Sequence, residues 1–145
     1  YALSRNSLPG KNDVTKAMIL SGIMWVTIYL IPFLKYPANP PTVGENETVV
    51  LRTFLYLLLI AISGIGALGF YKLFTRLQNN KKYFALLGYI IFIAVVFFVM
   101  PENPDVITAP MNLVNEFRLV SVLGVSSFWG SVGIILGLFW KKFDR

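Results

Sequence analysis

The stretch Pro32-Phe33-Leu34-Lys35-Tyr36-Pro37-Ala38-Asn39-Pro40-Pro41 lies between two long apolar runs of this 145-residue chain. Its four prolines each fix φ and remove a backbone N–H donor, and they disfavour helical geometry in the residues before them. We therefore expect this segment, termed the strap, to be a stiff and mostly extended connection between two helices. The strap residues singled out are Pro32, Phe33, Lys35, Tyr36, Pro37, Asn39, Pro40 and Pro41.

Four runs of sequence contain no charged residue, namely 17–34, 53–71, 83–100 and 119–140. Each is close to the roughly 20 residues with which a helix crosses a bilayer. Only 14% of the chain is charged, whereas soluble domains usually carry about 25%. Four buried soluble helices would leave too little polar surface in so short a chain. The sequence thus predicts an all-α integral membrane protein, one multi-pass domain over residues 1–145, with helices at about 14–35, 50–76, 83–100 and 110–141.

Charge is distributed unevenly between the two sides of such a bundle. Ten basic and two acidic residues share the side of both termini and the second connection, a net charge of +8. The strap side has three basic and five acidic residues, a net charge of −2. Because Lys and Arg in short loops mark the cytoplasmic side, we expect both termini inside, the strap outside, and the lipid bilayer of the cell membrane around the helices. This topology explains the total of +6 better than nucleic-acid binding, for which there is no soluble basic domain.

The chain contains no cysteine and no histidine. Disulfides, thiol redox chemistry, Cys/His catalysis and thiolate or imidazole metal sites are therefore excluded within it. The sequence also offers no phosphate-binding loop, no serine-centred motif and no pair of intramembrane carboxylates. We accordingly predict that this chain is not an enzyme and carries no cofactor.

Small residues recur at helical spacing in two of the predicted helices, where they allow helix backbones to approach closely in lipid. For the group at 64–69 we favour packing within the bundle. For the group at 124–137, packing within the bundle and a seam for another subunit remain equally open. The glycines concerned are Gly64, Gly66, Gly69, Gly124, Gly130, Gly133 and Gly137.

Three basic residues on the strap side, Lys35, Arg52 and Arg118, oppose the charge trend. We favour an electrostatic latch of Lys35, Arg52, Glu116 and Arg118, in which the arginines bind Glu116, Glu47 or carbonyls left free by the prolines. Snorkelling to the lipid headgroups and an anion site follow as second and third interpretations. Nearby, Asn46-Glu47-Thr48 is either a glycosylation sequon or a helix start with Thr48 as N-cap.

The strap and its surroundings also resemble a known family. Ile31 to Pro41, then Val43-Gly44 and Arg52-Thr53, are similar to the P-F-L-K-Y-P-A-N-P-P-x-V-G segment and the R-T pair of the CbtA-type predicted cobalt transporter subunits. Glu116-Phe117-Arg118-Leu119 resembles the family's opening of the last helix. Tyr1 to Gly10 looks like the family's linker after a more N-terminal helix, which implies an upstream membrane segment.

The resemblance covers essentially the whole chain, and it implies a subunit of a cobalt or metal-ion uptake system beside a small partner with a histidine-rich end. Cobalt(II) prefers imidazole or thiolate to oxygen ligands alone. Here the weak candidates are Glu45, Glu47 and Glu116, with Glu102, Asp105, Asn39, Met100 and Met111 as further candidate ligands. No acid lies within the four charge-free runs. Either a partner supplies the ligands, or the chain is a non-catalytic accessory subunit of a larger membrane complex, for instance a redox or energy-converting one.

Overall fold

The computed structural model describes residues 1, 4, 6–41, 43 and 46–143. Helices are the only regular secondary structure in these residues, which contain no strand. Four stretches are long and apolar enough to cross a membrane: Asp13–Lys35, Glu47–Arg76, Asn79–Val99 and Met111–Phe143. The prediction of an all-α fold is thus confirmed for the described residues, and these contain the four expected helices of sufficient length and apolar character to cross a membrane.

The first span consists of three consecutive segments: α1 (Asp13–Met24), a π-helical segment η1 (Trp25–Leu30) and α2 (Ile31–Lys35). Asn12 caps its start, because its side chain accepts a hydrogen bond from the backbone N–H of Thr15. Pro32 lies inside this helix, so the expectation that the strap begins with Pro32 is wrong at its first residues. Pro32, Phe33 and Lys35 are helical, and only the residues from Tyr36 onward leave the helix.

The π-helical segment explains how the helix accommodates Pro32. The backbone N–H of Ile31 donates to Val26, five residues back, and not to Thr27. The next potential donor to the Thr27 carbonyl is Pro32, which has no N–H. The hydroxyl of Ser63 takes this place and donates to the Thr27 carbonyl at 2.9 Å. A side chain from another helix thereby satisfies the carbonyl that the proline leaves free.

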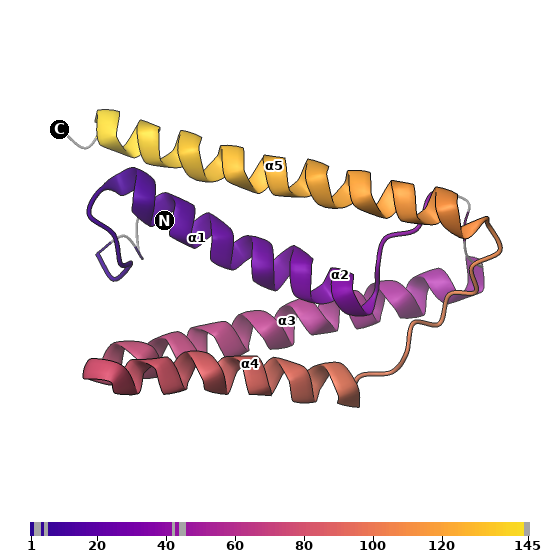
Figure 1. The fold of residues 1–145 in the computed structure, drawn as a ribbon, viewed down its shortest axis with the longest axis horizontal. Helices are drawn as coiled ribbons and strands as arrows, with labels where there is room; N and C mark the ends of the chain where they lie inside the picture. The colour runs from indigo at the N-terminus through magenta and orange to yellow at the C-terminus, as the bar shows by residue number, and fades with distance from the viewer. Residues whose placement is uncertain (2–3, 5, 42, 44–45, 144–145) are drawn as a thin grey trace.

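The remaining helices are α3 (Asn46–Arg76), a short 3₁₀ turn η2 (Asn79–Lys81), α4 (Lys82–Val99) and α5 (Met111–Phe143). They form two pairs, since α5 packs beside α1 while α3 packs beside α4. The first span runs diagonally between the pairs: α1 lies against α5, whereas η1 and α2 lie against α3 (Figure 1). Its crossing leaves α1 and the α3–α4 pair apart at one end of the bundle (Figure 1).

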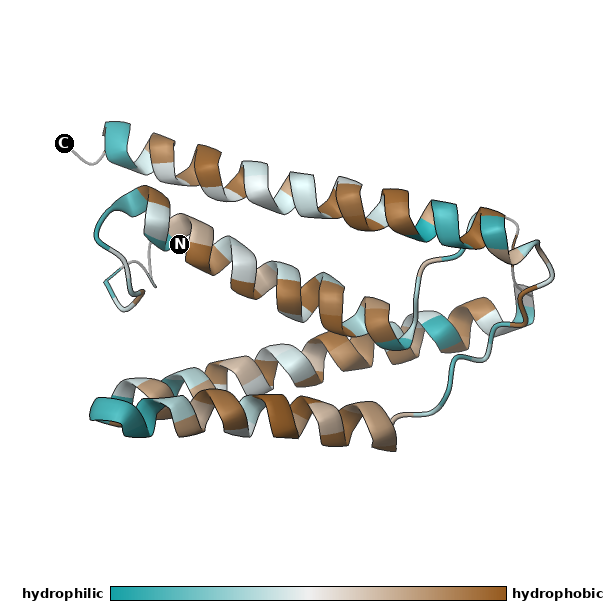
Figure 2. Cartoon of the chain, viewed as in Figure 1, coloured by the Kyte–Doolittle hydropathy of each residue, from teal (hydrophilic) through white to brown (hydrophobic). Residues whose placement is uncertain are grey.

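Hydrophobic residues dominate the middle of the helices, and hydrophilic residues gather at the two ends (Figure 2). Many large apolar side chains point outward, such as Val50, which is 78% exposed, and Phe98, which is 84% exposed. Such exposure suits a surface that faces lipid. The buried hydrophobic cluster lies toward the strap and comprises Ile31, Tyr36, Leu55, Leu59 and Met100.

Some of the glycines singled out in the sequence lie at helix contacts. A Cβ built on Gly137 would lie 2.5 Å from the Cα of Val14, and one on Gly133 would lie 2.7 Å from the sulfur of Met18. Both glycines therefore let α5 approach α1 closely. On α3, Gly66 accommodates the ring of Phe92 from α4. A Cβ on any of the other four would meet nothing within 4 Å, namely on Gly64, Gly69, Gly124 and Gly130.

Candidate functional site

A group of polar side chains that contains a buried carboxylate lies at the strap end of the bundle, where both long non-helical connections lie. Asp105, in the connection between α4 and α5, is its centre, since its side chain is only 1% exposed. The carboxylate pairs with Arg52 of α3 and accepts hydrogen bonds from Thr48 at 2.8 Å and Asn39 at 3.0 Å. A buried carboxylate needs such partners, because an unpaired charge in this environment is costly.

Arg118, near the start of α5, extends this group to the fourth membrane span. Its Nε donates to the carbonyl of Ala38 at 3.2 Å, and its Nη2 donates to the side-chain oxygen of Asn39 at 3.0 Å. Asn39 thus accepts from Arg118 and donates to Asp105. We call these five residues the strap-end cluster: Asn39, Thr48, Arg52, Asp105 and Arg118.

Tyr36 also links the strap to the α4–α5 connection. It is fully buried, and its hydroxyl donates to the carbonyl of Pro101 at 2.7 Å. Burial raises the pKa of Tyr36 above its ordinary value, which keeps the hydroxyl protonated and able to donate. The strap is therefore tied to the α4–α5 connection through both Tyr36 and Asn39.

The four residues of the predicted latch do not all meet. Arg52 and Arg118 do bind groups of the two connections, but the carboxylate that Arg52 binds is Asp105. Glu116 is exposed on α5, so the predicted latch is corrected at this residue. Lys35 lies elsewhere, with its ammonium 4.9 Å from the centre of the Phe97 ring on α4. Asp105 is better placed than Glu116, because the α4–α5 connection brings its carboxylate to Asn39 of the strap and Arg52 of α3.

Thr48 also differs from its expected role. Helix α3 begins at Asn46, so Thr48 lies within the first turn and is not the N-cap. Its hydroxyl instead donates to Asp105.

The two weak candidate metal ligands that the structure describes, Glu47 and Glu116, do not form a metal site. Glu47 and Glu116 are both exposed, and Glu45 lies outside the described residues. Within the part of the chain that the structure describes, no three of its acidic residues group closely enough to hold a metal ion. The Asp105 carboxylate is already occupied by Arg52, Thr48 and Asn39.

A second set of polar side chains surrounds the π-helical segment in the middle of the bundle. These side chains were not among the predicted sites. Besides the bond from Ser63 to Thr27, the hydroxyl of Tyr56 lies 3.4 Å from the carbonyl of Ile28. On α4, Tyr89 donates to the carbonyl of Ser63 at 3.2 Å. All of these contacts cross between helices, so they connect the first span to the α3–α4 pair at the depth of the π segment.

Comparison with known proteins assigns this arrangement to a family. The CbtA family, described as probable cobalt transporter subunits, matches residues 1–141. This chain belongs to the CbtA family. The match covers essentially the whole chain, and together with the four apolar helices it identifies a multi-pass membrane protein of a transport system. No curated protein and no solved structure matches the chain.

Membership of the CbtA family confirms the resemblance drawn from the strap. A subunit of a transporter works with other membrane subunits, so partner chains are implied. The structure describes this CbtA subunit by itself.

Proposed function

We propose that this chain is the membrane scaffold of a cobalt uptake system and that a partner subunit supplies the metal ligands. The observation that carries the proposal is the family match over residues 1–141. The chemistry of the chain supports the division of labour, since it contains no histidine or cysteine. Its best-placed buried carboxylate, Asp105, is held by Arg52. The strap-end cluster then serves to fix the two long connections, and the metal ion is the cargo of the assembly.

Cobalt accumulation in cells tests this proposal. Cells that carry the chain with its native neighbours should take up cobalt from micromolar medium, and cells lacking only this chain should not. Complementation by the chain should restore uptake. Unchanged cobalt accumulation after its deletion would exclude the transport role.

We further propose that the chain alone binds cobalt(II) weakly, because only oxygen ligands and thioethers are available to it. Calorimetry of the purified chain with cobalt(II) should show no tight site. Copurification in mild detergent should recover a small, histidine-rich membrane partner. Submicromolar binding that depends on Glu47 or Glu116 would contradict the assignment of the ligands to a partner.

A second candidate is an accessory subunit that packs against a larger membrane complex. Gly124 favours it, because a Cβ there would meet nothing within 4 Å and this part of α5 could accept a neighbour. The copurification experiment separates the two candidates. A large complex at fixed stoichiometry, without effect on cobalt uptake, would favour the accessory role.

We also propose that both termini face the cytoplasm, on the basis of the net charges of +8 and −2 on the two sides. A cysteine placed at Asn79 should resist an impermeant thiol reagent in intact cells, and a cysteine at Asn46 should react. The chain has no native cysteine that would interfere. The opposite labelling pattern would reverse the orientation.

A further inference from the structure

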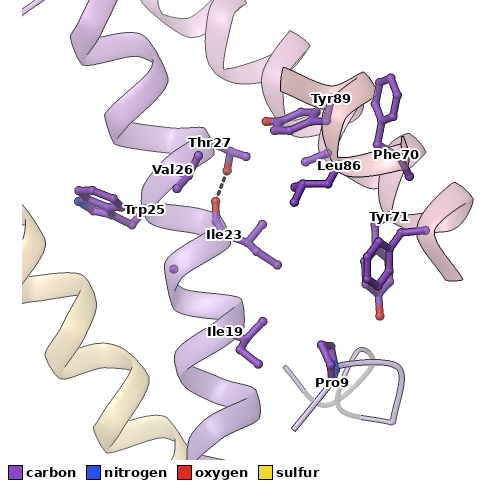
Figure 3. A pocket seen from close by; sticks show the side chains of 14 residues that line it. Pro9, Ile19, Ile23, Trp25, Val26, Thr27, Phe70, Tyr71, Leu86 and Tyr89 are labelled. Carbon is purple, nitrogen blue, oxygen red and sulfur yellow. Dashed lines mark hydrogen bonds between the residues drawn. The ribbon is translucent and has the colours of Figure 1, made fainter. Parts of the chain in front are cut away.

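An apolar groove of about 580 Å³ lies between the first span and the α3–α4 pair, on the half of the bundle away from the strap. It exists because the first span leans toward α5 at this end and meets α3 only from η1 onward. Ile19, Ile23 and Val26 form one wall, and side chains of α3 and α4 form the other (Figure 3). Trp25 also lines the groove, on the side of the first span that faces α5 (Figure 3).

The hydroxyl groups along the groove are already engaged with the protein, whereas the indole N–H of Trp25, which also lines it, is buried without a hydrogen-bond partner. The hydroxyl of Thr27 donates to the carbonyl of Ile23 at 2.9 Å, and Tyr89 donates to the carbonyl of Ser63. Tyr71 donates to the carbonyl of Ser7 in the N-terminal segment. The groove thus presents hydrocarbon and aromatic surface to its occupant, which must itself be apolar.

The end of the groove away from the strap is basic. Pro9 and Phe74 line this end, and the ammonium of Lys82 lies 5.9 Å from the centre of the Phe74 ring. Lys72 and Arg76 lie on either side of Phe74 along α3, and both are exposed. An occupant with an apolar body and an anionic head would therefore be complementary to both parts of the groove.

The volume of the groove favours a single hydrocarbon chain over a partner helix as its occupant. A helix about 10 Å wide with a pitch of about 5.4 Å fills roughly 400 Å³ in each turn. The groove, at about 580 Å³, would enclose less than two turns of a partner helix, and the rest of such a helix would lie outside it. A single flexible hydrocarbon chain, in contrast, can follow the groove along the first span.

We propose that this groove binds one acyl chain of an anionic phospholipid, whose phosphate lies beside Lys82 with Lys72 and Arg76 close by. The site goes beyond the transport role and does not depend on it. The acyl chain would fill the space between α1 and α3 that the protein's own side chains leave open.

The test uses two matched pairs of variants in the full chain. Ala67 lines the groove, and Ala67→Phe should block it, while Ala61→Phe changes an exposed position of the same helix that does not line the groove. Lys82→Gln removes the cation at the basic end of the groove. Lys142→Gln removes a lysine of α5 that also stacks on an aromatic ring, with its ammonium 5.6 Å from the centre of Phe143.

Each protein is placed in nanodiscs of phosphatidylcholine and phosphatidylglycerol in equal parts, extracted in mild detergent and examined by native mass spectrometry. Wild type, Ala61→Phe and Lys142→Gln should retain one phosphatidylglycerol. Ala67→Phe should retain no lipid, and Lys82→Gln should lose about fivefold in its preference for phosphatidylglycerol, the effect of one basic residue.

Circular dichroism of all five proteins checks that their helical content is equal. Equal lipid retention by Ala67→Phe and Ala61→Phe would overturn the groove as the site. Equal retention of the two lipids by the wild type would overturn the anionic headgroup. A wild-type chain that retains no lipid would likewise refute the proposal and point to a protein occupant of the groove.

Discussion

The two ends of this bundle are held together by different interactions. At the strap end, the buried carboxylate of Asp105 joins three segments through Arg52, Thr48 and Asn39, and Arg118 adds a fourth. At the basic end, α1 and α5 meet through close backbone contact at Gly133 and Gly137. There α1 stands away from α3 and α4, and a groove of about 580 Å³ remains between them.

The difference follows from the backbone. Helices satisfy their own hydrogen bonds, so a helical end can be held by packing alone. The strap from Tyr36 onward and the α4–α5 connection are not helical, and their carbonyls need donors from elsewhere. Tyr36 and Arg118 supply such donors to Pro101 and Ala38. A bundle with this asymmetry should be rigid at the strap end and more easily opened at the basic end.

The largest effect is expected from Asp105→Ala. Without the carboxylate, Arg52 loses its ion pair, and Thr48 and Asn39 lose their common acceptor. Removing one partner of a buried pair typically costs about 3–5 kcal/mol. The free energy of unfolding, measured in detergent by SDS titration with circular dichroism, should fall by that amount.

Glu102→Ala is the matched control for Asp105→Ala, because Glu102 is an exposed acid of the same connection. It should change the free energy of unfolding by less than about 0.5 kcal/mol. If the two variants were equally stable, the strap end would not be the polar centre of the fold.

Gly137→Ala tests the basic end, where the contact is steric. The added Cβ would lie 2.5 Å from the Cα of Val14, so α1 and α5 must move apart. Overpacking of this kind costs about 1–3 kcal/mol. Gly124→Ala adds the same atom to α5 in open space and should leave the free energy of unfolding unchanged or raise it slightly. A Gly137→Ala protein as stable as wild type would show that this end adapts without loss.

Much of the fold could be predicted from the sequence, because membrane spans leave a direct signal in apolar length. The charge-free runs gave four helices, and the structure has four spans at these positions. The interior of the first span could not be predicted in the same way. Proline is disfavoured inside a helix. Pro32 is accommodated by the π-helical segment and by the hydroxyl of Ser63, 31 positions further along the chain, which donates to the Thr27 carbonyl.

The sequence predicted that charged side chains at the strap end bind one another, but it did not predict which carboxylate takes part. Opposing charges and free carbonyls on the strap side indicated that Arg52 and Arg118 need partners there. Which carboxylate meets Arg52 depends on how the α4–α5 connection folds back over α3, and spacing along the chain does not determine that. Glu116 was therefore chosen where Asp105 is found.

Arg118→Ala should have a smaller effect than the variants at Asp105 and Gly137. It removes two donors, to Ala38 and Asn39, but leaves the Arg52–Asp105 pair in place. Loss of these bonds should cost about 1–2 kcal/mol. Arg118→Lys keeps the charge but not the planar fork and should recover only part of that loss. Lys81→Ala at the exposed 3₁₀ turn is the control and should be neutral. Full recovery in Arg118→Lys would mean that charge alone, without the geometry of the fork, holds the strap.

The smallest effect is expected from Ser63→Ala, which tests the π-helical crossing between the two ends. The variant leaves the Thr27 carbonyl without the donor that replaces the missing N–H of Pro32. Hydrogen bonds between membrane helices are worth about 0.6 kcal/mol on average, so the free energy of unfolding should fall by about 0.5–1 kcal/mol. Ser127→Ala, at an exposed position of α5, should be silent. A loss as large as that of Asp105→Ala would place the centre of stability at the crossing rather than at the strap end.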